Sequence, residues 1–384
     1  MNYLFSSESV TKGHPDKVAD RISDAILDAA LKEDENSRVA CEVAVKSDFV
    51  LVFGEITTNA EIDFEKVVRD TINEIGYNDN KLGFNGNTVE MALKITKQSS
   101  EIAQGVSLKD KLDQGAGDQG IMFGFASNET KNYMPRSIDL AHKLALRLEE
   151  VREKGIVKGI RPDGKTQVTI EYDKNHKPVR IDTIVISTQH DETHNQTSLK
   201  SVLVKEVVNK VVDQNYIDGK TKIFVNPTGS FILGGPAADS GLTGRKLIVD
   251  TYGGYARHGG GAFSGKDPSK VDRSAAYMMR YLAKNIVAAG LADKAELQVA
   301  YAIGISKPVS LYIDTFGTEK VDKELIYKTI NDNFDLRPAA IIEKLDLKKP
   351  IYKKLASSGH FGENAKDMTW EKLDSVDIFK NLLK

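Results

Sequence analysis

One arrangement of helices and strands recurs three times along this chain at nearly equal spacing. In each copy an amphipathic helix precedes two strands joined by a short connection, and a second helix follows. The three strand pairs begin near residues 39, 166 and 295, which are 127 and 129 residues apart, close to a third of the 384 residues. Self-similarity at a fixed period is a strong indication of fold. We therefore predict three related units, each with helices on one face of a sheet.

The first copy sets the pattern. Apolar residues at helical spacing predict a helix near 18–29, and strands are predicted at 39–46 and 49–57. A second helix over 62–75 ends at Gly76, a residue type that commonly terminates helices. The corresponding helix, strand, strand and helix are predicted at 140–151, 166–172, 178–188 and 199–212, and again at 275–289, 295–303, 308–316 and 323–334. The predicted fold class is α+β, with mostly antiparallel sheets covered by helices.

Composition excludes several classes of function. A net charge of −2 does not favour nucleic acid or a membrane surface as a general partner. No apolar run approaches the roughly 18 residues of a membrane span, and residues 1–8 turn polar too early for a signal peptide. Cys41 is the only cysteine, so no intramolecular disulfide is possible. We predict a cytoplasmic protein with no nucleic acid and no membrane among its partners.

The most unusual segment combines three consecutive glycines with lysines and carboxylates (residues 259–273, Gly-Gly-Gly-Ala-Phe-Ser-Gly-Lys-Asp-Pro-Ser-Lys-Val-Asp-Arg). Glycine lets a backbone approach a ligand closely. Lys266 and Lys270 supply charge for phosphate, and Asp272 can hold a hard cation such as Mg²⁺. Part of the segment fits the start of a P-loop, but Asp267 stands where a P-loop needs Ser or Thr. The segment therefore predicts a polyphosphate site of another kind.

Three shorter motifs point to the same chemistry. Residues 13–17 (Gly-His-Pro-Asp-Lys) precede the first helix, whose N-terminus attracts anions; Asp16 is either a Mg²⁺ ligand or a plain helix-start residue. Residues 241–246 (Gly-Leu-Thr-Gly-Arg-Lys) favour an anion contact, with a solvated loop charge as the alternative. Residues 161–165 (Arg-Pro-Asp-Gly-Lys) alone indicate only a turn entering a hairpin.

Two further motifs lose their usual meaning in context. Residues 115–120 fit G-x-G-x-x-G, but the strand is predicted after them rather than before, which argues against a dinucleotide fold. Residues 190–194 (His-Asp-Glu-Thr-His) carry Asp where a zinc protease needs Glu, so a polar loop entering a helix is expected. The polar stretch 98–119 has no clear period, and long loops of this kind are functional lids or disordered.

Glu42 and Glu55 lie on the first predicted hairpin. By strand alternation, Glu55 shares a face with Phe49, Leu51 and Phe53. A carboxylate on an apolar face is costly unless it has a partner. A bound cation, a ligand ammonium group or an Arg from elsewhere in the chain would satisfy it.

Taken together, residues 13–17, 115–120 and 259–273 resemble the methionine adenosyltransferase family, also called S-adenosylmethionine synthetases, and the resemblance runs through essentially the whole chain. It implies three βαββαβ-type units with pseudo-threefold symmetry at 1–100, 113–230 and 231–371, and a mobile active-site loop at 98–108. It implies that ATP and L-methionine are joined into S-adenosylmethionine and that the triphosphate is then hydrolysed to pyrophosphate and phosphate. Members form dimers, usually paired into tetramers, with active sites at the dimer interface.

The resemblance also implies roles for individual residues. Two Mg²⁺ per site would be bound by Asp16 and Asp272, and K⁺ by Glu42. The implied catalytic residues are His14, Lys165, Arg245, Lys246, Lys266 and Lys270. The implied ATP contacts are His14, Asp163, Lys165, Ser230, Phe231, Asp239, Arg245, Lys246, Ala262 and Lys266. The implied methionine contacts are Glu55, Gln98, Asp118, Asp239 and Lys270. Ser230 stands where many relatives carry Arg, which leaves the backbone for its ATP contact.

The chemistry of such a transfer fits these residue types. A thioether sulfur is already a nucleophile and needs no general base. Its attack on the ribose C5′ needs alignment, which can supply about 7–11 kcal/mol, and stabilisation of an anionic leaving group. Two alternatives remain at this point, a nucleotide sensor that binds ATP without chemistry and a P-loop kinase. The acidic residues Glu55, Asp118 and Asp239 favour a second ligand with an ammonium group, which a sensor does not need.

Overall fold

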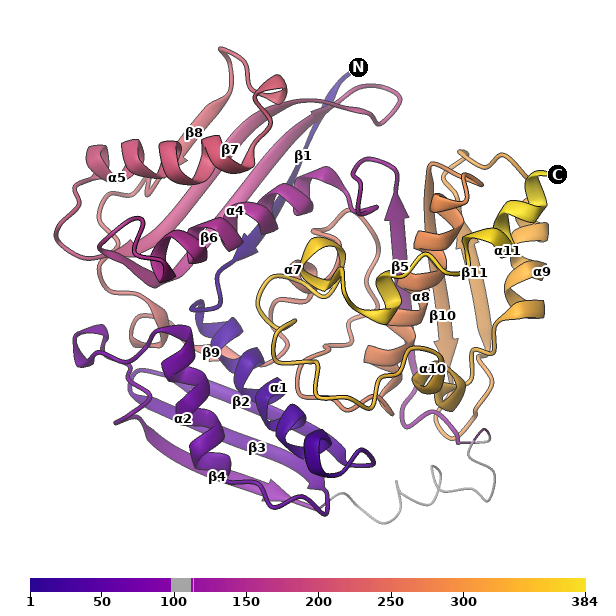
Figure 1. Cartoon of the computed structure of the whole chain (residues 1–384), viewed down its shortest axis with the longest axis horizontal. Coiled ribbons are helices and arrows are strands. Elements are labelled where there is room, and N and C mark those ends of the chain that lie inside the picture. Colours follow the sequence, from indigo (N-terminus) through magenta and orange to yellow (C-terminus); the bar gives the residue numbers. More distant parts are fainter. Residues whose placement is uncertain (98–111, 113) are drawn as a thin grey trace.

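The computed structural model describes residues 1–97, 112 and 114–384 as three sheets with helices packed on one face of each (Figure 1). The first repeat contains β1 (Tyr3–Val10), α1 (Pro15–Glu33), β2 (Arg38–Lys46), β3 (Phe49–Thr57), α2 (Phe64–Ile75) and β4 (Glu90–Thr96). The second contains β5 (Gly120–Ser127), α4 (Arg136–Glu153), β6 (Ile160–Tyr172), β7 (Pro178–His190), α5 (Gln196–Leu203), α6 (Asn209–Val211) and β8 (Lys222–Val225). The third contains β9 (Gly241–Leu242), α7 (Leu247–Asp250), α8 (Val271–Ala288), β10 (Lys294–Tyr301), β11 (Ser310–Asp314) and α9 (Lys323–Asn333), with α10 (Pro338–Lys344) and α11 (Val376–Lys380) after it.

The three repeats exchange their first strands in a cycle. The sheet orders are β1-β6-β7-β8, β11-β10-β5 and β4-β3-β2-β9. Strand β1 of the first repeat therefore pairs with the hairpin of the second, β5 of the second with the hairpin of the third, and β9 of the third with the hairpin of the first. Each exchanged strand is antiparallel to its partner. The domain boundaries at 1–100, 113–230 and 231–371 stay a prediction, and strand pairing crosses all of them.

The predicted α+β class and the threefold recurrence are confirmed. The three hairpins form where they were predicted, although β6 begins at Ile160 rather than 166, with an irregular register between Ile160 and Gly164. Most pairings are antiparallel, with β3–β4 and β7–β8 as the parallel ones. One helix differs from its prediction of 199–212. The α-helix α5 ends at Leu203, a π-helical turn follows over Val204–Val208, and α6 ends the helical stretch at Val211. Residues 190–194 end β7 and lead into α5 as a polar loop, as predicted. The predicted active-site loop at 98–108 lies outside the described residues.

Burial explains which face of each sheet the helices cover. In β2, the side chains of Val39, Cys41, Val43 and Val45 are buried and alternate with half-buried or exposed ones. Helices α1 and α2 lie on that buried face (Figure 1). Helix α4 covers β1 and β6, and α8 covers β5 and β10 in the same way.

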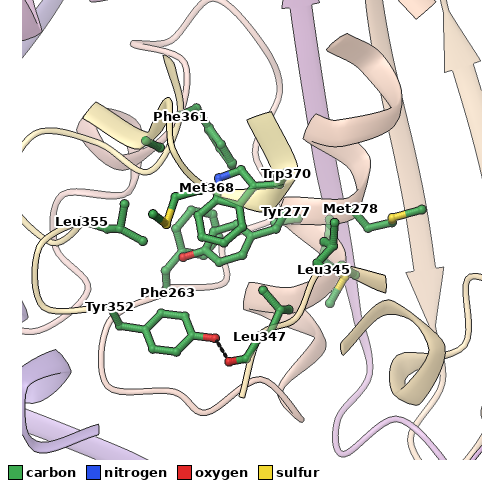
Figure 2. Packing of buried hydrophobic residues seen from close by; sticks show 14 of the residues in the cluster. Phe263, Tyr277, Met278, Leu345, Leu347, Tyr352, Leu355, Phe361, Met368 and Trp370 are labelled. Carbon is green, nitrogen blue, oxygen red and sulfur yellow. Dashed lines mark hydrogen bonds between the residues drawn. The ribbon is translucent and has the colours of Figure 1, made fainter. Parts of the chain in front are cut away.

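A second layer of core lies between α8 and the C-terminal segment. Trp370 stacks on Tyr277 of α8 with ring centroids 3.9 Å apart, and Phe263 and Phe361 pack edge-on around Tyr277 (Figure 2). This aromatic cluster packs residues 345–370 against α8, and the C-terminal segment also contacts the segment 259–273 through Phe361 on Phe263 and Tyr352 under Arg273 (Figure 2). In the part of the chain that the structure describes, no helix is long and apolar enough to cross a membrane.

Candidate active site

The N-terminus of α1 gathers the motif at 13–17 and the cations of 241–246. His14 is the N-cap of α1, and its Nδ1 accepts a hydrogen bond from the Asp16 backbone N–H at 3.2 Å. The Asp16 side chain is 1% exposed. It accepts hydrogen bonds from Lys246 Nζ at 2.6 Å and from the Leu242 N–H at 3.1 Å, and Arg245 Nε lies 3.3 Å from it. Two cations and a helix N-terminus therefore surround a single carboxylate.

These neighbours shift the pKa values of His14 and Asp16. Burial, reinforced by Lys246 and Lys165, lowers the pKa of His14 to about 3, so the imidazole is neutral at physiological pH. Burial alone would raise the pKa of Asp16, but the hydrogen bonds from Lys246 and from Leu242 outweigh it and hold that pKa below its ordinary value. The 3.9 Å approach of His14 to the Asp16 carboxylate is therefore not an ion pair.

The hairpin entry at 161–165 brings two more predicted residues to the same region. Asp163 is 7% exposed and accepts a hydrogen bond from the Gly235 N–H at 2.8 Å, while its Oδ1 is buried with no hydrogen-bond partner among the described residues. Burial raises the pKa of Asp163 to about 6, against hydrogen bonds that lower it, and Asp239 adds to the rise. Lys165 is exposed and acts electrostatically on both Asp163 and His14.

Phe231 follows a loop that hydrogen bonds fix in place. Its N–H donates to His190 Nε2 at 3.1 Å, and its carbonyl accepts from the His190 N–H at 2.9 Å. Ser230 beside it is exposed. The ring of Phe231 is close enough to Gly234 that a Cβ there would lie 2.9 Å from it.

The glycine–lysine segment 259–273 runs beside β2 and carries a second cluster. The Cys41 N–H donates to Gly265 O at 2.9 Å, and Lys266 forms an isolated bridge with Ala40. Lys266 Nζ lies 2.5 Å from Asp272 Oδ2. Lys266 also lowers the pKa of Glu42 on β2, although burial, the largest cause, leaves that pKa raised.

The glycines of this segment let the backbone approach functional side chains. A Cβ at Gly261 would lie 2.3 Å from Asp272 Oδ1, so only glycine leaves room for that carboxylate. The two clusters also touch, because a Cβ at Gly244 would lie 2.7 Å from Cβ of Ala262. The loop at 241–246 and the segment 259–273 therefore form one continuous surface of cations and carboxylates beside α1.

The carboxylates fit a particular kind of metal binding. Within residues 1–97, 112 and 114–384, no three His, Cys, Asp or Glu side chains are grouped to hold a metal ion. Asp16 and Asp272 instead stand singly, each beside a lysine. Mg²⁺ in phosphate sites is commonly bound by one or two carboxylates together with the phosphates of the substrate. The donor set thus fits Mg²⁺ arriving with a nucleotide rather than a cage built by the protein alone.

In the described part of the chain, the remaining predicted residues take no part in the ion pairs around Asp16 and Asp272. Glu55 and Asp118 are exposed, and Asp118 accepts a hydrogen bond only from the neighbouring Gln119 N–H among the interactions seen in the described chain. Lys270 is held by Asp267 Oδ2 at 2.5 Å. Gln98 lies outside the described residues. A cleft of about 790 Å³ between β1 and β10 is lined by none of the predicted site residues.

Sequence reasoning missed a network of buried charges directly beneath the site. Lys17 is fully buried between Asp20 and Asp250, and Arg273 is fully buried against Asp24 at 2.7 Å. One signal in the sequence could have found its carboxylates: aspartates at 16, 20, 24 and 28 recur every four residues and so share one face of α1.

Comparison with known protein families identifies the family of this chain. The N-terminal, central and C-terminal domains of S-adenosylmethionine synthetase match residues 2–100, 113–231 and 233–372. The chain belongs to the S-adenosylmethionine synthetase family. All three domains of the family are present in their order, so the chain is a methionine adenosyltransferase that makes S-adenosylmethionine from ATP and methionine. Enzymes of this family use a divalent metal and potassium.

Proposed function

We propose that this S-adenosylmethionine synthetase works in two steps at the surface formed by 13–17, 161–165, 241–246 and 259–273. The methionine sulfur attacks C5′ of ATP and releases the whole triphosphate, which is then hydrolysed to pyrophosphate and phosphate. The observation that carries the proposal is the placement of Arg245 and Lys246 beside Asp16 at the N-terminus of α1, with Lys266 on the adjoining segment 259–273, whose Ala262 lies next to Gly244. Leaving-group charge is stabilised best by such preorganised cations and backbone donors.

His14 is proposed to contact the leaving oxygen, O5′, as a neutral donor. Its Nδ1 accepts the Asp16 N–H, so the proton of the neutral ring is on Nε2. Burial and two lysines keep the pKa of His14 at about 3, so the ring is neutral near neutral pH and only a weak base. The thioether sulfur carries no proton, so the first step needs none to be removed.

The cations and polar groups divide between the two substrates. Lys165, Arg245, Lys246 and Lys266 are proposed to bind the polyphosphate chain. Asp163, Phe231, Ala262 and the backbone of Ser230 are proposed to line the nucleoside part of the ATP site. Glu55, Gln98, Asp118, Asp239 and Lys270 are proposed to surround methionine and its junction with ATP. The exposure of Glu55 and Asp118 in a single chain is consistent with a methionine site completed by a second copy.

The ions proposed are two Mg²⁺ per site and one K⁺. Asp16 and Asp272 would hold Mg²⁺ and Glu42 would hold K⁺. When bound, Mg²⁺ neutralises phosphate oxygens and so stabilises the leaving group. The protein's own part is to place Asp16 beside Lys246 and Asp272 beside Lys266, within reach of the polyphosphate.

A homo-oligomer with interfacial active sites, a dimer of dimers, is proposed for the assembled enzyme. The face of the sheet β4-β3-β2-β9 that points away from α1 and α2 carries Phe49, Leu51 and Phe53, all half-buried, and Leu242, which is 38% exposed. An uncovered apolar sheet face of this kind favours a second copy as its cover. Glu55 lies on the same face, which brings a proposed methionine contact to the interface. The cytoplasmic location stays a prediction from the sequence.

The test is to incubate the purified protein with ATP, methionine, Mg²⁺ and K⁺ and to identify the products by mass spectrometry. S-adenosylmethionine with pyrophosphate and phosphate is the expected result. ADP formed without S-adenosylmethionine would instead identify a kinase or an ATPase. ATP binding with no turnover would identify a nucleotide sensor. Omission of K⁺ or Mg²⁺ should lower the rate of the first step, and an unchanged rate would contradict the proposed ion.

A further inference from the structure

Helix α1 carries a ladder of four aspartates on one face, and each accepts backbone N–H groups from a loop. Asp16 accepts from Leu242 at 3.1 Å, and Asp20 accepts from Gly244 at 2.8 Å. Asp24 accepts from Gly265 at 2.9 Å. Asp28 accepts from Tyr352 and Lys353, both at 2.9 Å. Spacing of four residues puts successive carboxylates about 6 Å apart along the helix axis.

The second and third aspartates hold the two loops that bear the phosphate-binding cations. Asp20 fixes Gly244, the residue directly before Arg245 and Lys246. Asp24 fixes Gly265, the residue directly before Lys266. Both carboxylates are 0% exposed, so neither can reach a substrate itself. Their effect on the reaction must therefore pass through the loops.

Buried cations lock both aspartates in place. Lys17 Nζ donates to Asp20 at 2.9 Å and also to Asp250, at the far end of the loop that begins at Gly241. Arg273 donates to both oxygens of Asp24 and also to the carbonyls of Phe263 and Lys266. Each loop is thus tied to α1 on two sides, once through a backbone N–H and once through a buried cation.

We propose that Asp20 and Asp24 are positioning residues that hold the loops of Arg245, Lys246 and Lys266 on successive turns of α1, and so set the spacing between the cations that bind the polyphosphate chain. This inference rests on the polyphosphate roles under the proposed function. A merely structural role would predict that the aspartates of the ladder affect tripolyphosphate binding alike, whether fully buried, as Asp20 and Asp24 are, or partly buried, as Asp28 is. Positioning predicts that Asp20 and Asp24 affect polyphosphate binding and that Asp28 does not, because the loop at 352–353 carries no proposed phosphate ligand.

The matched variants are Asp20→Ala and Asp28→Ala, each of which removes one aspartate from the same helix face. Asp20→Ala leaves Lys17 paired with Asp250, so no buried charge is left alone. Inorganic tripolyphosphate is the probe, because it tests the polyphosphate contacts without the adenosine or methionine contacts. Its Kd is measured by calorimetry on the full chain, beside the KM values for ATP and for methionine and the Tm of each variant.

Asp20→Ala is expected to weaken tripolyphosphate binding roughly 10- to 100-fold and to raise the KM for ATP with little change in the KM for methionine. Asp28→Ala is expected to lower the Tm and leave the Kd within about twofold. Equal effects of the two variants on the Kd would overturn positioning. Lys246→Ala distinguishes failure of the proposed polyphosphate role from failure of the positioning role. If Lys246→Ala leaves the Kd unchanged, the proposed polyphosphate role is wrong. If Lys246→Ala weakens binding and Asp20→Ala does not, only the positioning role is refuted.

Hydrogen exchange on the wild-type protein tests the anchors even if Asp20→Ala does not fold. The amides of Gly244 and Gly265 should exchange at least about 100-fold more slowly than the amide of the exposed Gly219. Exchange of both at the rate of Gly219 would show that the anchors do not hold the loops.

Discussion

Substitution of Arg273 gives the sharpest test of how the buried charges next to the site stabilise the protein. Its guanidinium is fully buried, and it donates to Tyr277 Oη at 3.0 Å, to both oxygens of Asp24 at 2.7 and 2.8 Å, and to two loop carbonyls at 2.9 and 3.1 Å. It also lies over the ring of Tyr352 at 4.1 Å. Arg273→Met keeps an unbranched apolar stem but removes every one of these hydrogen bonds.

The loss of stability in Arg273→Met follows from the partner that the substitution leaves unpaired. Asp24 stays buried with only the Gly265 N–H of its present partners, and breaking a buried ion pair by removing one member costs about 3–5 kcal/mol. Arg180 provides the control. Its Nε and Nη2 donate to Asp218 at 2.7 and 3.0 Å and its Nη1 donates to Glu171 and Asp182 at 3.1 Å, but solvent reaches all three carboxylates, whose exposed fractions are 44%, 24% and 17%. Arg180→Met should cost less than Arg273→Met, because solvent reaches the carboxylates that it leaves unpaired.

The assay is urea unfolding followed by tryptophan fluorescence. Trp370 is the only tryptophan of the chain and stacks on Tyr277, so the signal reports this core. The double variant Asp24→Asn with Arg273→Met should be less destabilised than the sum of its single variants by more than about 1 kcal/mol, because the second change removes the charge that the first left unpaired. Equal costs for Arg273→Met and Arg180→Met, or additive costs in the double variant, would refute the reasoning.

Three further outcomes are expected. Gly261→Ala adds a Cβ that would lie 2.3 Å from Asp272 Oδ1 and should lower kcat by about tenfold or more, measured beside Gly219→Ala, whose Cβ meets nothing within 4 Å. Burial raises the pKa of Asp163 from 3.8 to about 6, so this carboxyl binds protons more tightly in the folded state and its contribution to stability is lost as the pH rises through that window. Asp163→Asn should remove that part of the pH dependence in urea unfolding between about pH 4 and 7, and an unchanged slope would contradict the assignment. Leu51→Glu charges the uncovered sheet face and should yield monomers in sedimentation velocity, whereas wild-type assembly in the variant would place the interface elsewhere.

The threefold repeat could be predicted because local patterns of apolar and polar residues determine its helices and strands. Strand alternation and helical periodicity depend on neighbours within about ten residues. The first and third hairpins begin at Arg38 and Lys294, next to their predicted starts, whereas the second begins at Ile160 instead of 166. The exchange of first strands could not be predicted in this way. Which hairpin β1 joins is decided by tertiary pairing, and β9 has only two residues, too few to show any alternation.

The same contrast holds for the site. The glycine, lysine and aspartate residues in 13–17 and 259–273 predict an anion site from residue types alone. The buried charges beneath it were missed because Lys17, Asp20 and Asp24 have the polarity of a solvent-facing helix side. Helix α1 is covered on both sides instead, by its sheet and by loops from the third repeat, so its polar face is an internal one.

The length of the exchanged strands explains why the aspartate ladder exists where it does. Strands β1 and β5 each make eight residue pairs with the hairpin they join, and this fastens the first and second repeats to their neighbours. Strand β9 makes two, Ala44 with Leu242 and Val45 with Gly241, which is too little to fix the long connection that leads from it to α8. The carboxylates of α1 hold this connection instead, because they accept hydrogen bonds from the N–H groups of Leu242, Gly244 and Gly265. A longer β9 would satisfy its own backbone in the sheet and carry Arg245 and Lys246 past the N-terminus of α1. Because β9 is short, the third repeat can place Arg245 and Lys246 against the first repeat. The buried aspartates of α1 then hold the connection that strand pairing does not hold.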